Sequence, residues 1–145
     1  MGKVSGILLA SLIGICLGLQ PPINSTLGKS LTPQIAAFHS ILTSFIIVFV
    51  VALFSGDLTN YKNIVNIHPI YWIGGVLGAC IVLFSIFTIP VLGASASITI
   101  FVTIQLIVGT IIDHFGLLGI NRSPVDLKQI VGMIILLIGV KLILK

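Results

Sequence analysis

The chain has 145 residues, of which 57% are hydrophobic and only 7% are charged, and its formal net charge is +4. A soluble globular domain has about 25% charged residues, so this composition excludes an ordinary soluble protein and indicates an integral membrane protein surrounded by lipid. The seven Lys and Arg residues are scattered over loops and ends instead of forming a basic stripe. We therefore expect no nucleic-acid partner.

The residues that usually carry catalysis or bind metals are sparse. The chain has no Glu, so no pair of carboxylates lies within a helix core to act as acid and base. Cys16 and Cys80 lie inside apolar segments, and the three His residues are dispersed. We expect no catalytic residues, no metal site and no cofactor, and hence not an enzyme.

Five apolar segments approach or exceed the length of about 20 residues that a helix needs to cross a bilayer. In chain order they cover about residues 4–27, 34–54, 70–89, 92–113 and 125–144. The sequence therefore predicts an all-α membrane protein, with five transmembrane helices in a single domain that covers residues 1–145.

Three of these helices have a matching start. Each of the pairs Thr32-Pro33, His68-Pro69 and Ser123-Pro124 places a polar side chain directly before a proline. A polar N-cap accepts a backbone N–H of the first turn, and proline is tolerated at the first helical position. The pattern predicts that the second, third and fifth helices begin at these pairs.

The first apolar segment contains the run Gln20-Pro21-Pro22-Ile23-Asn24. Proline lacks the N–H that a helix uses, and it pushes the preceding residue out of α geometry. In one interpretation the first helix ends at Gln20 and a short interfacial segment follows. In the other, a helix break at Pro21 and Pro22 leaves free carbonyls beside the amides of Gln20 and Asn24, which would suit a polar or cationic ligand.

The fourth apolar segment has two unlike faces at helical spacing, one of branched aliphatic residues and one of small or polar residues. The polar face comprises Ser95, Thr99, Thr103, Gln105, Gly109, Thr110 and Asp113. Because polar groups in hydrocarbon are costly unless they face protein or water, this face should be turned away from lipid. Gln105, near the middle, is expected to hydrogen-bond either a ligand or a neighbouring helix.

Two ionisable side chains are candidates for proton coupling. Asp113 lies near a helix C-terminus, where a carboxylate opposes the helix dipole. It is therefore either a proton or cation site or part of an ion pair, with Arg122, Lys128 or His114 as compensating groups. His39, in the second apolar segment, can exchange a proton near neutral pH or form a hydrogen bond to a backbone carbonyl.

The positive charges are almost balanced across the membrane. With five spans, one side carries Lys3, Lys62, Arg122 and Lys128, and the other carries Lys29, Lys141 and Lys145. Orientation normally follows a clear excess of Lys and Arg on the cytoplasmic side. The near balance predicts insertion in both orientations and an antiparallel homodimer with a 5+5 inverted repeat. The alternative is a fixed orientation with the N-terminus inside.

Several motifs occur along the whole chain in an order that is typical of one protein family. The most specific are Gln105, the run Asp113-His114-Phe115-Gly116, and Lys128 with Gly132. The others are residues 20–24 with Leu27-Gly28, Ala36-Ala37, Trp72 with Gly74, Gly75 and Gly78, and Pro90 with Leu92-Gly93. With these motifs the chain resembles the YdcZ family of inner-membrane exporters, within the drug/metabolite transporter superfamily.

The resemblance implies five-helix proteins that occur singly, as paired genes of opposite orientation, or fused into ten helices. It also implies a likeness to small multidrug resistance transporters, which are antiparallel dimers and rely on a glutamate in their first helix. This chain has no such glutamate, and His39 stands where the family pattern has an apolar residue.

These observations together predict a secondary transporter of the bacterial inner membrane that exports a small polar or cationic organic molecule. Gln20, Asn24 and Gln105 are the predicted substrate-binding residues, and Asp113 or His39 would couple transport to protons. The dual-topology homodimer would work by alternating access. A passive ion or small-solute channel formed by the same antiparallel dimer is the alternative, and a non-transporting scaffold subunit is a third possibility.

Overall fold

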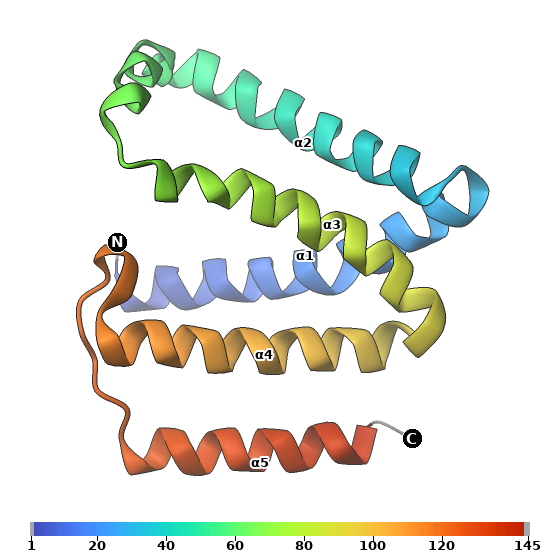
Figure 1. Ribbon diagram of the computed structural model, residues 1–145, viewed down its shortest axis with the longest axis vertical. Helices are drawn as coiled ribbons and strands as arrows, with labels where there is room; N and C mark the ends of the chain where they lie inside the picture. The colour runs from blue at the N-terminus through green and yellow to red at the C-terminus, as the bar shows by residue number, and fades with distance from the viewer. Residues whose placement is uncertain (1, 144–145) are drawn as a thin grey trace. The chain divides into compact units, whose positions relative to one another are not determined.

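A computed structural model describes residues 2–143 of the chain, and every regular element in that range is a helix (Figure 1). The elements are α1 (Lys3–Ser30), α2 (Pro33–Ser55), the 3₁₀ helices η1 (Asp57–Asn66) and η2 (Pro69–Trp72), α3 (Ile73–Leu92), α4 (Ala94–Phe115), the short η3 (Leu117–Gly119) and α5 (Leu127–Ile143). The predicted all-α class is confirmed.

Four segments are long and apolar enough to cross a membrane, as judged by length and composition. They are α1, α2, the stretch Pro69–Leu92, and α4. The fifth predicted segment corresponds to α5, which has 17 described residues. Most apolar side chains of all these helices are exposed, which suits helices whose outer surfaces contact lipid.

The first helix is longer than predicted. α1 continues through Pro21 and Pro22 to Ser30, so the predicted break and the alternative end at Gln20 are both wrong. The prolines remove the helical donors of only two carbonyls, those of Leu17 and Gly18. A real break would leave more backbone groups unpaired, and in hydrocarbon each one costs several kcal/mol. Continuing the helix is therefore the less costly solution.

Two of the three predicted helix starts are confirmed. The Thr32 hydroxyl accepts the backbone N–H of Ile35 at 3.3 Å, and Pro33 is the first residue of α2. The Nδ1 atom of His68 accepts the N–H of Ile70 at 3.3 Å. Here the proline begins the 3₁₀ turn η2, and α3 follows directly after it.

The third predicted start is wrong, because α5 begins at Leu127 and not beside Ser123-Pro124. Asp126 and Gln129 cap this helix reciprocally. The Gln129 N–H donates to the Asp126 carboxylate at 2.7 Å, and the Asp126 N–H donates to the Gln129 side-chain oxygen at 3.2 Å. This capping box satisfies two donors at once, so it sets the start of the helix.

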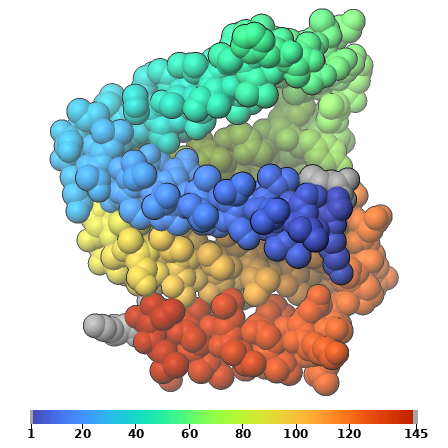
Figure 2. Space-filling view, turned by 180° about the vertical axis from the view of Figure 1, so that it is seen from behind, coloured from blue at the N-terminus to red at the C-terminus, as the bar shows by residue number. Residues whose placement is uncertain are grey.

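The chain divides into two compact units, of which the first ends at Val91. In this unit α1 and α2 pack together near the turn that joins them and diverge beyond it, while α3 crosses near the same turn (Figure 1). The buried core is small and consists of Ala36, Ala37 and Ile86, with Leu27, Val82 and Leu83 packed against it. Figure 2 shows the resulting hollow between α1 and α2, with α3 at its back.

Gly28 allows α3 to approach the α1–α2 turn closely. A Cβ atom added at Gly28 would lie only 2.7 Å from the Ile86 Cγ2 atom of α3 and 3.8 Å from the Ala36 Cβ atom. The glycine therefore provides the space that the Ile86 side chain fills. The first unit is closed at this end, where the core lies.

The second unit begins at Leu92 and contains α4 and α5, which lie side by side and antiparallel (Figure 1). α4 begins directly after Gly93, whose φ of 82° is in the left-handed region that glycine tolerates. Gly116 ends α4 in a left-handed conformation with a φ of 66°. A Cβ atom there would also lie 3.2 Å from the Arg122 Cβ atom, so the connection to α5 folds tightly against this glycine.

Candidate functional site

Asn24 is the predicted site residue with the most definite environment. Its side chain is 6% exposed, and its Nδ2 atom donates to the Ser40 hydroxyl at 3.1 Å, which links α1 to α2. Gln20, one helical turn earlier, is exposed. Sequence reasoning missed Ser40, although Asn24 and Ser40 lie equally far from Thr32 at the turn. Because the chain folds back at Thr32, residues at equal distances from Thr32 along the sequence come to lie side by side.

We expect the Asn24–Ser40 contact to be measurable in stability. Ser40→Ala and Asn24→Ala should each lower the melting temperature of the purified protein in detergent, while the double variant should be no worse than the worse single variant. A neutral hydrogen bond contributes about 0.5–1.5 kcal/mol, and those between membrane helices average about 0.6 kcal/mol. Ser44→Ala is the control, because that hydroxyl bonds only a carbonyl of its own helix. Fully additive losses would contradict the contact.

Ser25, next to Asn24, was also missed. It is 2% exposed, and its hydroxyl has no hydrogen-bond partner among the described residues. Buried hydroxyl groups are nearly always hydrogen-bonded, so this donor is unusual. It lies on the buried face of α1 together with Pro21 and Gly28. No motif in the sequence distinguishes it from the other serines of the apolar segments.

His39 follows the same turn but points elsewhere. Its side chain is exposed, and within residues 2–143 the imidazole makes no hydrogen bond. The hydrogen bond at this residue uses its backbone carbonyl, which accepts the Thr43 hydroxyl at 2.9 Å. The predicted alternative, an imidazole bonded to a backbone carbonyl, is therefore wrong, and the ring is free to meet a ligand or another chain.

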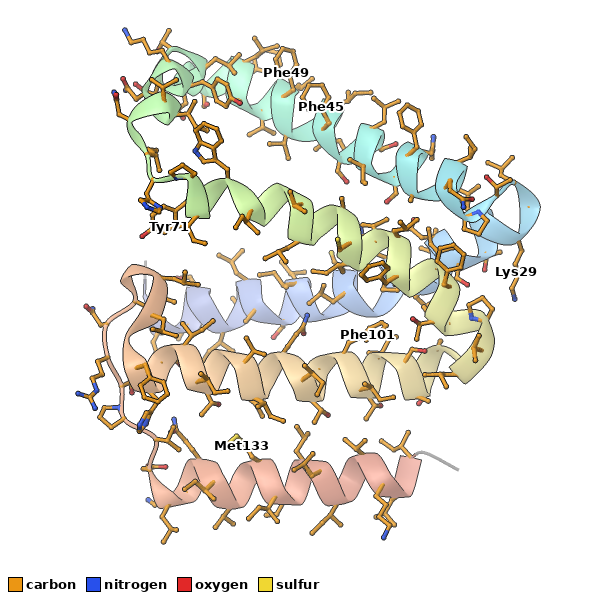
Figure 3. All side chains as sticks on the ribbon, in the orientation of Figure 1. Lys29, Phe45, Phe49, Tyr71, Phe101 and Met133 are labelled. Atoms are coloured by element: carbon orange, nitrogen blue, oxygen red, sulfur yellow. The ribbon has the colours of Figure 1, made fainter. Side chains whose placement is uncertain are left out.

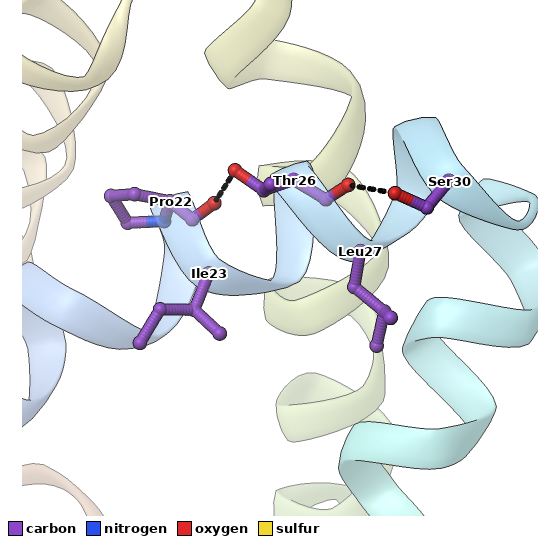
Figure 4. Close-up of a pocket in the computed structure, with 5 residues that line it drawn as sticks. All are labelled: Pro22, Ile23, Thr26, Leu27 and Ser30. Atoms are coloured by element: carbon purple, nitrogen blue, oxygen red, sulfur yellow. Dashed lines mark hydrogen bonds between the residues drawn. The ribbon is translucent and has the colours of Figure 1, made fainter.

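An open pocket of about 460 Å³ lies on α1 beside the prolines (Figure 4). It is lined by Pro22, Ile23, Thr26, Leu27 and Ser30. Its two hydroxyls are already engaged, since Thr26 donates to the Pro22 carbonyl at 3.0 Å and Ser30 donates to the Thr26 carbonyl at 3.5 Å. Neither Gln20 nor Asn24 lines it, so this pocket is not the predicted substrate site.

A second groove, of about 620 Å³, lies along α2 and is almost wholly apolar. Phe45 and Phe49, labelled in Figure 3, stack there with ring centroids 5.6 Å apart. Leu58 and Tyr61 of η1 close one end. The hydroxyl of Ser44, which also lines the groove, already donates to a carbonyl of α2. Such a surface suits contact with lipid chains and offers little to recognise a polar ligand.

Gln105 and Asp113 both lie on α4, in the second unit, and both are exposed. Neither side chain has a hydrogen bond or ion pair within the described part of the chain. The predicted ion pair of Asp113 is therefore not formed among these residues. Arg122, one of the predicted partners, donates its Nε–H to the backbone carbonyl of His114 at 3.1 Å.

Among the residues that the structure describes, no three His, Cys, Asp or Glu side chains gather in a group that could hold a metal ion.

The match to a protein family covers nearly the whole chain. A family model described as "Putative inner membrane exporter, YdcZ" matches residues 5–142. The chain belongs to the YdcZ family. No curated protein and no solved structure matches it. Membership, together with the long apolar helices, makes this chain a multi-pass protein of the inner membrane and confirms the resemblance drawn from its motifs.

In this YdcZ-family chain, the run Asp113-His114-Phe115-Gly116 joins α4 to the loop before α5. The His114 Nδ1 atom accepts the Val125 N–H at 3.2 Å, and the Asp113 carbonyl accepts the Ser123 N–H at 2.8 Å. The motif thus holds the loop in place through its backbone and its imidazole. Sequence reasoning missed this role of His114.

Proposed function

We propose that the protein is a secondary transporter that exports a small polar or cationic organic molecule. The observation that carries the proposal is the match of residues 5–142 to a family of inner-membrane exporters. In this proposal α5 is the fifth span, because its described residues between Gln129 and Lys141 are all apolar or glycine.

In the proposal, two copies of opposite orientation form the transporter. The near balance of Lys and Arg, four on one side and three on the other, supports insertion in both orientations. Two inverted copies reproduce the inverted repeat on which alternating-access carriers are built. The buried core of the first unit is small, which supports a second subunit as the other wall of the pathway.

The substrate binds at Gln20, Asn24 and Gln105 in this proposal. Hydrogen-bond acceptors near the first two support a substrate that is a donor. They are the Leu17 and Gly18 carbonyls, which lack helical donors because Pro21 and Pro22 have no N–H. The buried hydroxyl of Ser25 adds a group that needs a partner. An amine or a polyol would satisfy the two carbonyls, while a carboxylate, which has no donor, would not.

The form of the first unit supports alternating access. Side chains fill the space between the helices where α1 meets α2, and α1 and α2 diverge towards the opposite end (Figure 1). An alternating-access carrier is closed at one end at a time, and its two halves exchange the open and closed conformations during the cycle. His39 and Asp113 are the ionisable side chains proposed for proton coupling, since both are exposed.

Counterflow into proteoliposomes tests the proposal. A thermal-shift screen of the purified protein against amines, sugars and other metabolites first identifies a ligand. Saturable exchange of the labelled ligand against the unlabelled one is then expected, because a carrier moves substrate by changing conformation. Uncoupled current at channel rates would instead favour the passive channel. A scaffold subunit would be favoured by a different result. Deleting this protein would then cause the loss of a partner protein, and the variants Gln105→Ala and Asn24→Ala would still restore that partner.

Orientation can be measured separately. Reporters active only in the periplasm or only in the cytoplasm, fused after residue 145, should give about equal signals, because the charge bias is a single residue. Adding two lysines to the Ser55–His68 loop should make the signal one-sided. A strongly one-sided signal from the unaltered chain would contradict insertion in both orientations.

A further inference from the structure

One face of α4 carries a regular row of residues that are open in the subunit. Ser95, Val102, Leu106 and Asp113 are exposed, and Thr99 and Gly109 between them are half-exposed. The six positions alternate steps of four and three residues, which is the spacing of a helix-pairing face. We call this row the α4 seam.

The α4 seam is symmetric about residue 104, which lies at the middle of α4 (Ala94–Phe115). Reversing the helix about that point exchanges Ser95 with Asp113, Thr99 with Gly109, and Val102 with Leu106. Two antiparallel copies of α4 therefore place these residues opposite each other. A parallel pair would instead set the two Asp113 carboxylates side by side, which is unfavourable.

Each of the exchanged pairs is chemically matched. Val102 and Leu106 would form an apolar centre, and Gly109 beside Thr99 would allow close approach of the two backbones. Within residues 2–143, no atom outside the backbone of α4 lies within 4 Å of a Cβ added at Gly109, so there is room beside it.

The ends of the seam match in charge. Asp113 has no ion pair in the described chain, and an exposed carboxylate on a membrane helix is costly. The N-terminus of α4 begins at Gly93, which supplies no capping side chain. An antiparallel copy would bring its Asp113 to this positive helix end, beside Ser95. The arrangement is reciprocal, so each copy caps the other.

We propose that the α4 seam is the surface on which a second copy of this chain docks, with α4 packed antiparallel on α4. The inference rests on the proposed antiparallel homodimer and deepens it by naming the contact. Gln105 adjoins the seam next to its centre, so the two Gln105 side chains come together near the two-fold axis. This places a substrate-binding residue of both copies at a single site between subunits.

Disulfide cross-linking in native membranes tests the contact. The background is the full chain with Cys16→Ser and Cys80→Ser, since both cysteines are free. In the double variant Ser95→Cys/Asp113→Cys, the two positions of one α4 are about 27 Å apart, too far for a bond within a chain. Mild oxidation should give a covalent dimer, whereas each single variant should remain mostly monomeric on a denaturing gel.

A second pair keeps Asp113 intact. In Thr99→Cys/Gly109→Cys the positions of one helix are about 15 Å apart, and a covalent dimer is again expected. Ile100→Cys/Val108→Cys is the matched control, because these residues lie at similar heights outside the seam. This control pair should cross-link at least tenfold less.

The outcomes separate the inference from the proposed function. Efficient cross-linking of the single variants would mean that the copies are parallel. That result would overturn both the α4 contact and the proposed antiparallel transporter. Saturable counterflow with no cross-linking of either seam pair would overturn the α4 contact and leave the transporter intact. A control pair that cross-links as well as the seam pairs would also overturn the contact.

Discussion

Replacing Gly28 with valine should strongly destabilise the protein, and the second replacement Ile86→Ala should restore much of the loss. A Cβ at Gly28 would lie 2.7 Å from the Ile86 Cγ2 atom, so valine cannot fit without moving α3. Overpacking of this kind costs about 1–3 kcal/mol. The melting temperature of the purified protein in detergent measures the effect.

Gly14→Val is the matched control for this experiment. Gly14 also lies in α1, but a Cβ atom added at this position would have no atom from outside the helix within 4 Å. It therefore reports the cost of valine in the helix without the contact to α3. If Gly28→Val were no worse than Gly14→Val, or if Ile86→Ala added to the loss, Ile86 would not pack on Gly28.

Replacing Gln105 with alanine should lower the rate of counterflow about tenfold while the melting temperature stays within about 1 °C. The expected loss of transport corresponds to one hydrogen bond to a ligand, about 0.5–1.5 kcal/mol for neutral groups and more for a charged one. Stability should hardly change, because the amide has no hydrogen bond within the described subunit and is exposed.

Thr110→Ala controls for the loss of a polar group from α4. The Thr110 hydroxyl donates to the Leu106 carbonyl of its own helix at 2.8 Å, so its removal should leave counterflow nearly unchanged. The concentration dependence adds a second readout, since a lost substrate contact should raise the half-saturating concentration. Unchanged counterflow in Gln105→Ala would remove this residue from the proposed site.

Local physical chemistry explains which helix starts the sequence predicted correctly. Thr32 and His68 cap their helices through contacts to residues only two or three positions away, so the pattern of residues is sufficient. The prediction that a helix begins beside Ser123 was wrong because Asp126 and Gln129 form two reciprocal hydrogen bonds that start the helix later. Sequence reasoning considered the Ser123-Pro124 signal alone and missed the capping box.

The error at Pro21 and Pro22 has a different cause. Proline propensity was measured mainly in water, where a broken helix can bond to solvent. In hydrocarbon the backbone has no such partner, so α1 passes through both prolines. The predicted ligand groups remain, but as carbonyls without donors in a continuous helix and not as the ends of a broken one.

The site shows the same division between local and distant contacts. Asn24 was singled out because it lies beside the two prolines, and Gln105 because an amide in an apolar helix is costly unless it faces protein or water. Ser40 and Ser25 were not, because a serine in a membrane helix usually bonds its own backbone. Only the meeting of α1 with α2 gives Asn24 its partner and buries Ser25.

The sequence by itself determined the membrane class, the helical content and the polar face of α4, since each follows from composition or from spacing along one helix. The order of motifs along the whole chain carried the resemblance to the family, which the match of residues 5–142 confirms. Only the tertiary structure decided that Ile86 fills the space at Gly28, that Asn24 donates to Ser40, and that Asp113 forms no ion pair with the other described residues. Those outcomes depend on which helices meet and at what distance, and no short pattern of residues records that.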